Sequence, residues 1–261
     1  MSTARERLAT TALSYGLTDE FVRLGLHRIH QDVLRHSRHI REAGFKSIHP
    51  DDLAFLFNAY DEHFFAGLCQ QALSGRRLTF RLSRRMTLAG GTTSRLRAHT
   101  GEISFEIAIA IDTLFDGFGE TDRAVTVGGL ECRNRLEALQ RIFEHEFVHL
   151  VEQLCWDQSD CSAPRFQGIA ARFFLHRAHT HNLITRKERA AKSGVRAGSR
   201  VTFQFEGRNL TGRVNRITKR ATVLVEDAEG RKYSDGLRYK IFYVPIGSLQ
   251  LAAVSDPTVD K

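Results

Sequence analysis

The spacing of apolar residues changes near Gly194, and this change divides the chain into two parts with different predicted folds. Before it, helix and strand patterns are mixed and lack the regular alternation of a doubly wound sheet. After it, short strand-like runs are separated by turn residues, which is typical of a small all-β barrel. The sequence therefore predicts an α+β domain followed by a barrel. The runs are RVTFQFEG, LTGRVNRI, ATVLVEDAEG, RKYSDG and KIFYVPIGSLQL.

Local signals set the boundaries of the predicted segments. Residues 1–48 are expected to form N-terminal helices, and HPDD at 49–52 has the proline and acids that begin a further helix. In the domain at 49–185, LTFRLSRRM and GEISFEIAIAI predict strands, while LAGGTTSRL predicts a turn and DGFGETDRAVTVGG a loop. LITRKERAAKSGVRAGS is the predicted linker to a barrel at 193–252.

The composition is that of an ordinary globular protein. The chain has 261 residues, of which 42% are hydrophobic and 26% charged, enough to bury a core. No apolar run approaches the roughly 18 residues of a membrane span, and the start lacks the apolar region of a signal peptide. The four cysteines include no CxxC pair, which favours a reducing compartment. We therefore expect a cytoplasmic protein with no membrane partner.

FEHEFVHLVEQL lies in a predicted helix from Asn134 to Cys155 and places His145 and His149 one turn apart. A helical wheel puts both histidines away from the predicted core-facing stripe. Side chains four residues apart on a helix lie about 5–6 Å apart at Cβ, so two imidazoles can bind one Zn²⁺. Glu146 then points beside the metal and can take a proton from water. The stripe comprises Leu136, Leu139, Phe143, Phe147, Leu150 and Leu154.

Four segments together resemble the SprT-like metalloprotease domain, the family that includes Spartan-type DNA-repair proteases. The resemblance covers about residues 50–176 and implies a zincin-like fold, bound zinc and a protein or peptide substrate near DNA. In that family, a third histidine ligand usually lies in an HGxxF-type motif a dozen or more residues after HExxH. The segments are FNAYDEHFFAGL, TFRLSRRMTLAGGTTSR, EISFEIAIAI and EHEFVHLVEQL.

The third ligand departs from the family pattern. Matching Phe166 to the aromatic residue of the motif places Ser162 at the histidine position, next to Cys161. A thiolate is a good zinc ligand, and a polar loop entering a helix suits it, so Cys161 is the predicted third ligand. The alternative is a free, buried cysteine.

Three later histidines are the other candidates for the third ligand: His176, His179 and His181. A helix that starts at Pro164 puts His176 about 18 Å along its axis, too far from the site unless the helix breaks.

Two further acids of the histidine helix have open roles. Glu144 is expected to be solvated or ion-paired. Glu152 lies on the histidine side, where it can orient a ligand, reach the metal itself or make an ordinary ion pair.

The charge of the chain favours a polyanionic partner. The net charge is +8, and residues 192–240 hold twelve Lys/Arg against five Asp/Glu. Arg213, Arg216, Lys219 and Arg220 cluster at one predicted hairpin, with tyrosines nearby, which suits nucleic-acid binding by phosphate contacts and stacking. The alternatives are a solvated barrel with tyrosines in its core, and a protein-binding barrel.

These patterns predict a zinc-dependent peptidase acting on or near nucleic acid, associated with the nucleoid if the barrel binds DNA. The alternative is a non-catalytic nucleic-acid-binding or regulatory protein on a zincin scaffold. The missing third histidine favours that alternative, whereas Glu146 opposes it, because a purely structural site needs no base.

Overall fold

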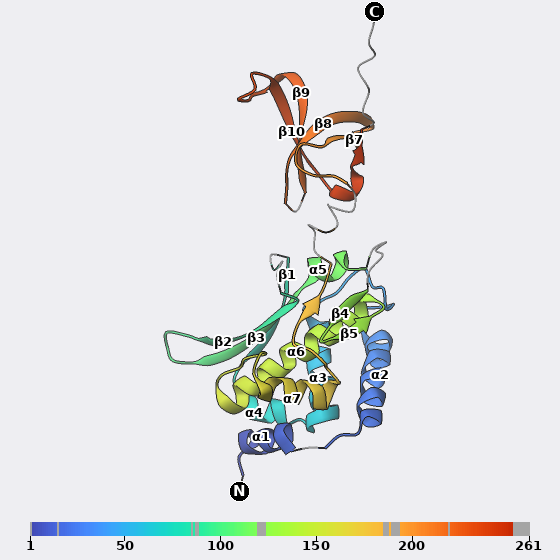
Figure 1. The fold of residues 1–261 in the computed structure, drawn as a ribbon. Coiled ribbons are helices and arrows are strands. Elements are labelled where there is room, and N and C mark those ends of the chain that lie inside the picture. Colours follow the sequence, from blue (N-terminus) through green and yellow to red (C-terminus); the bar gives the residue numbers. More distant parts are fainter. Residues whose placement is uncertain are drawn as a thin grey trace, which may run out of the picture. The chain divides into compact units, whose positions relative to one another are not determined.

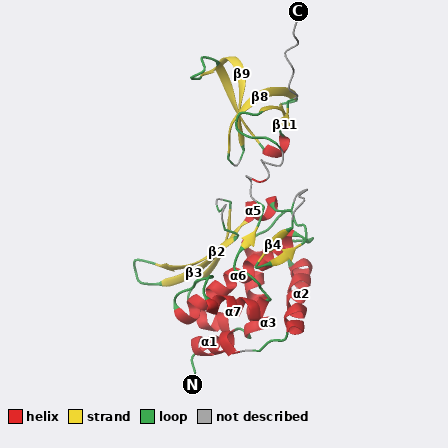
Figure 2. Cartoon of the chain, viewed as in Figure 1, coloured by secondary structure: helices red, strands yellow, loops and turns green. Residues whose placement is uncertain are grey.

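The chain folds as two compact units, Met1–Leu183 and Ile184–Lys261. The computed structural model describes residues 2–14, 16–84, 86, 89–118, 124–184, 188, 194–218 and 220–252. Helices and strands are mixed in the first unit, as Figures 1 and 2 show, so the fold is α+β. Among the described residues, no helix has the length and apolar character needed to span a membrane.

Helices form the first part of the first unit. They are α1 (Ala4–Ser14), α2 (Asp19–His36), α3 (Pro50–Phe65) and α4 (Leu68–Leu73). The predicted start of α3 is confirmed: Pro50 occupies the first turn, and the backbone N–H of His49 donates to Asp52 at 2.8 Å. This satisfies a backbone donor that the helix itself leaves unpaired.

A three-stranded sheet follows, made of β1 (Leu78–Ser83), β2 (Gly91–Arg97) and β3 (Ile103–Ala110) in the order β1-β3-β2. β3 pairs in parallel with β1 and antiparallel with β2. The predicted strands correspond to β1 and β3. The turn was predicted at the glycine pair, but the segment that begins at Gly91 is the edge strand β2, because its residues pair with β3 from Gly91 onward.

A second small sheet joins segments far apart in the sequence. β4 (Val125–Val127) pairs with β5 (Leu130–Cys132) and with β6 (His181–Asn182), in the order β5-β4-β6. The prediction that residues 116–129 form only a loop is therefore wrong, since β4 lies within them. Short α5 (Ile111–Asp116) follows β3 directly.

Helix α6 (Arg135–Trp156) runs through the first unit, packing against β2 and β3 as well as α7 (Pro164–Phe174), as Figure 1 shows. Asn134 caps its N-terminus by accepting a hydrogen bond from the N–H of Glu137 at 2.9 Å. The predicted stripe is buried, but the prediction that this stripe alone is the core face of the helix is wrong. The helix is central, so residues on its other faces are buried too: Ala138, Ile142, Glu146, Val148, Val151 and Glu152.

The second unit contains β7 (Arg200–Phe205), β8 (Arg208–Ile217), β9 (Ala221–Lys232), β10 (Arg238–Val244), the short 3-10 helix Ile246–Ser248 and β11 (Gln250–Leu251). The strands form an antiparallel sheet in the order β10-β9-β8-β7-β11. RKYSDG is not the separate strand predicted, because β9 continues to Lys232 and a turn follows. Valines, Phe203 and Leu249 form the core. Closure into a barrel stays a prediction.

Candidate metal centre

The two histidines of α6 converge through their ring nitrogens. His145 Nε2 and His149 Nε2 are 3.1 Å apart. Both rings pack against Phe166 of α7, with centroid separations of 4.8 and 4.5 Å. Two imidazole nitrogens bound to one tetrahedral zinc ion lie about 3.3 Å apart. The histidine pair therefore has the spacing that a shared metal ion requires.

Cys161 joins the histidines from the loop between α6 and α7. The chain reverses here: α6 ends before Asp157, which has a left-handed φ of 59°, and α7 begins at Pro164. The donor atoms of His145, His149 and Cys161 all lie within 4.8 Å of one another. Nitrogen and sulfur ligands of a tetrahedral zinc are about 3.6 Å apart, so at most a small closure of the loop completes the set.

This donor set fits zinc better than a hard cation, because two imidazoles and a thiolate are ligands that zinc prefers. Cys161 is a free cysteine, as the alternative expected, but its side chain is partly exposed and not buried. The residues that the sequence singled out are thus brought together in a group that can hold a metal ion.

Glu146 lies beside this group, with only 3% of its surface exposed. The Thr93 hydroxyl on β2 lies 2.8 Å from the backbone oxygen of Glu146 and 2.9 Å from its Oε2, although the two residues are 53 positions apart. Gly91 makes the close approach of β2 possible: a Cβ there would lie 2.7 Å from Cγ of Glu146. Strand β2 therefore fixes where the carboxyl group points.

Burial dominates the electrostatics of the site. It raises the pKa of Glu146 to about 8, and the Thr93 hydrogen bond only partly offsets this. Burial, reinforced by His149, lowers the pKa of His145 to about 3, and burial also lowers the pKa of His149. Both imidazoles are therefore neutral at pH 7, the form that binds metals.

The Cys161 thiol has a raised pKa because of burial and the nearby carboxylate of Asp160. Coordination to a metal ion removes the proton from a thiol, and a nearby cation likewise favours an ionised carboxyl group. A bound cation would thus reverse the effect of burial on both Cys161 and Glu146.

Glu152 does not point to the metal group. It is fully buried, and Arg165 donates its Nε–H to Glu152 Oε1 at 2.6 Å. Its other oxygen accepts the hydroxyl of Ser159 at 2.6 Å. Of the three roles open for Glu152, the ion pair is confirmed, and the three-donor group found among the described residues does not include Glu152. The spacing of residues in the sequence did not indicate that Ser159 or Arg165 would contact Glu152.

Glu144 belongs to the opposite side of α6 and is also fully buried. Arg141 and the Nε2 of His176 pair with it, each at 2.9 Å, and the Tyr60 hydroxyl donates to it at 2.8 Å. Burial opposes ionisation of Glu144, but Arg141, His176 and Tyr60 outweigh it and hold its pKa below the ordinary value. The expectation of an ion pair is confirmed, and the alternative of a solvated Glu144 is wrong.

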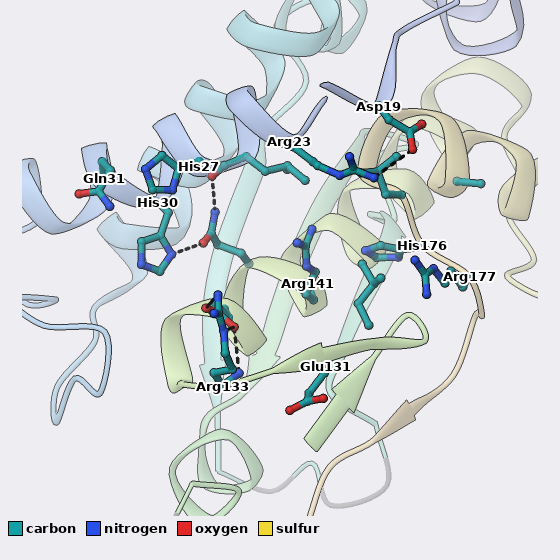
Figure 3. A pocket seen from close by; sticks show the side chains of 16 residues that line it. Asp19, Arg23, His27, His30, Gln31, Glu131, Arg133, Arg141, His176 and Arg177 are labelled. Atoms are coloured by element: carbon teal, nitrogen blue, oxygen red, sulfur yellow. Dashed lines mark hydrogen bonds and ion pairs between the residues drawn. The ribbon is translucent and has the colours of Figure 1, made fainter. Parts of the chain in front are cut away.

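Figure 3 shows the groove on this side of α6, with Arg141 and His176 near Arg23 and His27 of α2. Its volume is about 820 Å³. The arginines largely pair with acids, as Arg23 does with Asp19 at 3.2 Å. We therefore assign the charged residues that line this groove to the packing of α2 on α6.

The later histidines separate because α7 stops at Phe174 and Leu175 adopts a left-handed φ of 59°. His176 turns toward Glu144, whereas His179 and His181 return to a cavity of about 390 Å³ beside His145, Glu146 and Cys161. His181 Nε2 accepts the N–H of Gly90 at 3.0 Å. Among the described residues, the three-donor group includes none of these three histidines.

The predicted nucleic-acid-binding arginines lie in the second unit on or beside β8. Arg213 pairs with Asp235 at 3.5 Å, whereas Arg216 and Arg220 are exposed and have no ion-pair partner in the described part of the chain. Lys219 lies outside the described residues. Tyr239 is buried and donates to Asp235 at 2.9 Å, so it belongs to the packing of the sheet.

Comparisons of the chain with models of known families, with curated proteins and with solved structures found no match.

Proposed function

We propose that the chain is a zinc-dependent peptidase of the SprT-like, zincin type. The observation that supports this most directly is the convergence of His145, His149 and Cys161 beside the buried carboxyl group of Glu146. An ordinary structural zinc site is closed by four protein ligands and needs no acid, whereas a catalytic one has three and keeps a position open. The cavity next to these residues gives a substrate room to approach.

The arrangement of β2 supports a peptide substrate. As an edge strand of the sheet, β2 has one side without a partner strand in the described part of the chain, and Thr93 links it to Glu146. An extended peptide that adds to this edge through backbone hydrogen bonds would run past the carboxyl group.

His145, His149 and Cys161 would hold the zinc ion, which would supply a Lewis acid that lowers the pKa of water and polarises a carbonyl group. Glu146 would accept the proton that water loses as its oxygen attacks the peptide carbon. The same carboxyl group delivers that proton to the amine as the C–N bond breaks. Thr93 holds Glu146 in place for both transfers.

Two measurements test this function: the zinc content of the purified chain and the cleavage of an unfolded protein, free or crosslinked to DNA. We expect about one zinc per chain, and loss of about 100-fold or more of the activity in Glu146→Gln. Glu131→Gln is the matched control, since Glu131 is exposed on β5. Zinc binding without cleavage that depends on Glu146 would instead favour the non-catalytic, regulatory alternative.

We further propose that the second unit tethers the peptidase to nucleic acid in the cytoplasm. Exposed Arg216 and Arg220, free of acidic partners in the described residues, support phosphate contacts. Replacing both by alanine should reduce the salt dependence of duplex DNA binding by a slope of about 1.8. Lys240→Ala is the control, because Lys240 already pairs with Asp227 at 2.8 Å. Binding unaffected by the double substitution, or by salt, would refute the tether.

A further inference from the structure

A chain of hydrogen bonds leads from His149 away from the metal group to Arg165. His149 Nδ1 lies 2.7 Å from Ser159 Oγ. The Ser159 hydroxyl lies 2.6 Å from Glu152 Oε2, and Arg165 Nε lies 2.6 Å from Glu152 Oε1. Every member is in hydrogen-bond range of the next, and Glu152 is fully buried.

The chemistry of these groups determines where the protons lie. A guanidinium only donates, and a carboxylate only accepts, so Glu152 takes hydrogen bonds from both Arg165 and Ser159. The single hydroxyl proton of Ser159 is used in this way. Because that proton goes to Glu152, the Ser159 oxygen can only accept a hydrogen bond from His149. The imidazole proton of His149 must therefore lie on Nδ1. The Nε2 of His149 is left with its lone pair, facing His145 Nε2 at 3.1 Å.

The same serine belongs to the loop that carries Cys161. The N–H of Asp160 also approaches Glu152 Oε2, at 3.4 Å, and the guanidinium of Arg165 lies 4.3 Å from the ring centre of Trp156. These contacts connect the end of α6, the loop and the first turn of α7. Ser159 therefore links the second ligand of the group to the segment that holds the third.

We infer that Ser159 is a positioning residue of the metal centre, which acts through His149 and through the loop of Cys161. The inference rests on the proposed zinc site. With Glu152 and Arg165, Ser159 selects the Nδ1-protonated tautomer of His149 and so presents Nε2 to the metal. Groups that orient metal-binding histidines in this way contribute about 10- to 100-fold to metal affinity.

Two readouts on the full-length chain test this role. The first is the tautomer of His149 in the metal-free protein, from ¹⁵N chemical shifts of the imidazole, assigned with His149→Gln. The second is zinc affinity, from competition with a chromophoric chelator. Ser159→Ala should reduce the Nδ1-protonated population and weaken zinc binding about 10- to 100-fold. Ser159→Thr keeps the hydroxyl and should restore both.

Ser162→Ala is the matched control in the same loop. Ser162 bonds to Asp160 Oδ1 through its N–H at 2.9 Å and its hydroxyl at 2.7 Å, not to His149 or Glu152. It should leave the tautomer and the affinity unchanged. If Ser159→Ala does not fold, Glu152→Gln replaces it. An amide can donate to Ser159, turn the hydroxyl toward His149 and favour the opposite tautomer.

The results separate this inference from the proposed function. A change in tautomer together with weaker zinc binding supports the positioning role, whether or not the protein cleaves any substrate. An unchanged tautomer and unchanged zinc affinity in Ser159→Ala overturn it, even if Glu146-dependent cleavage is found. A wild-type chain that does not bind zinc overturns both.

Discussion

Replacing Gly91 by alanine should displace the proposed general base while leaving the proposed metal ligands in place. The new Cβ would lie 2.7 Å from Glu146 Cγ, 2.8 Å from Oε1 and 2.9 Å from Cδ. Carbon atoms in contact are about 3.5–4.0 Å apart, so the carboxyl group must move by about 1 Å. All three of the nearest atoms belong to Glu146, and none belongs to His145, His149 or Cys161.

Such a displacement should lower peptide cleavage by about 100-fold, the effect expected when a catalytic group is misplaced by about 1 Å. The overpacking itself costs about 1–3 kcal/mol of the free energy of unfolding, which lowers the melting temperature by a few degrees. Zinc content should not change. The assay compares turnover of an unfolded protein substrate, bound zinc and thermal unfolding in the wild type and the variant.

Gly90→Ala is the matched control, because the three atoms nearest to a Cβ there all belong to the side chain of Ile142, at 3.2 Å or more. A small shift of Ile142 accommodates it, so turnover should stay close to that of the wild type. Wild-type turnover and wild-type melting temperature in Gly91→Ala would refute the placement of Glu146 against β2. Loss of zinc from the variant would show that the metal ligands also depend on this contact.

Three further predictions concern the metal and the buried groups around α6. Removing zinc with a chelator should lower the melting temperature by about 5–10 °C if the metal is present at 100 times its Kd, and added zinc should restore it; an unchanged melting curve contradicts metal binding. Glu144→Gln should reduce the free energy of unfolding at pH 7 by about 3 kcal/mol, because Arg141 loses its buried partner. Since folding lowers the pKa of Glu144, its contribution is present above pH of about 4.3 and is lost as the pH falls through the folded-state pKa. Denaturant unfolding of the wild type and Glu144→Gln between pH 7 and pH 3 should show that the difference between their free energies of unfolding decreases as the pH falls. A difference that stays constant would contradict this. Gly128→Ala introduces the strain of a positive φ and also a Cβ that lies 2.7 Å from the ring of His176. Gly75→Ala introduces the same kind of strain, but no atom lies within 4 Å of a Cβ there. Thermal unfolding should show Gly128→Ala to be the less stable by about 2 kcal/mol, and equal melting temperatures would show that His176 moves freely.

Signals contained in a few consecutive residues predicted much of the local structure. The proline and acids at 49–52 marked the start of α3, and the apolar spacing marked α6. The i, i+4 spacing also predicted that His145 and His149 share one side of the helix, because helical geometry alone fixes that relation. Cys161 followed from its place near the expected third-ligand motif, by resemblance and not from local geometry.

Contacts between distant segments decided what the sequence left open or predicted wrongly. The segment after Gly90 became a strand because β3 offered it a partner, and α6 is buried on more than one face because both the sheet and other helices pack against it. His176 turns away where α7 ends at Phe174, and its contact with Glu144 holds it apart from the three-donor group.

The sequence by itself determined the histidine pair and the acid between them, because one turn of helix is enough to align side chains. Only the tertiary structure decided what surrounds them. Thr93 comes from a strand 53 residues away, and Arg165 reaches Glu152 from the next helix, 13 residues on. These partners depend on how β2 and α7 pack on α6, and the periodicity of a single helix carries no information about that packing.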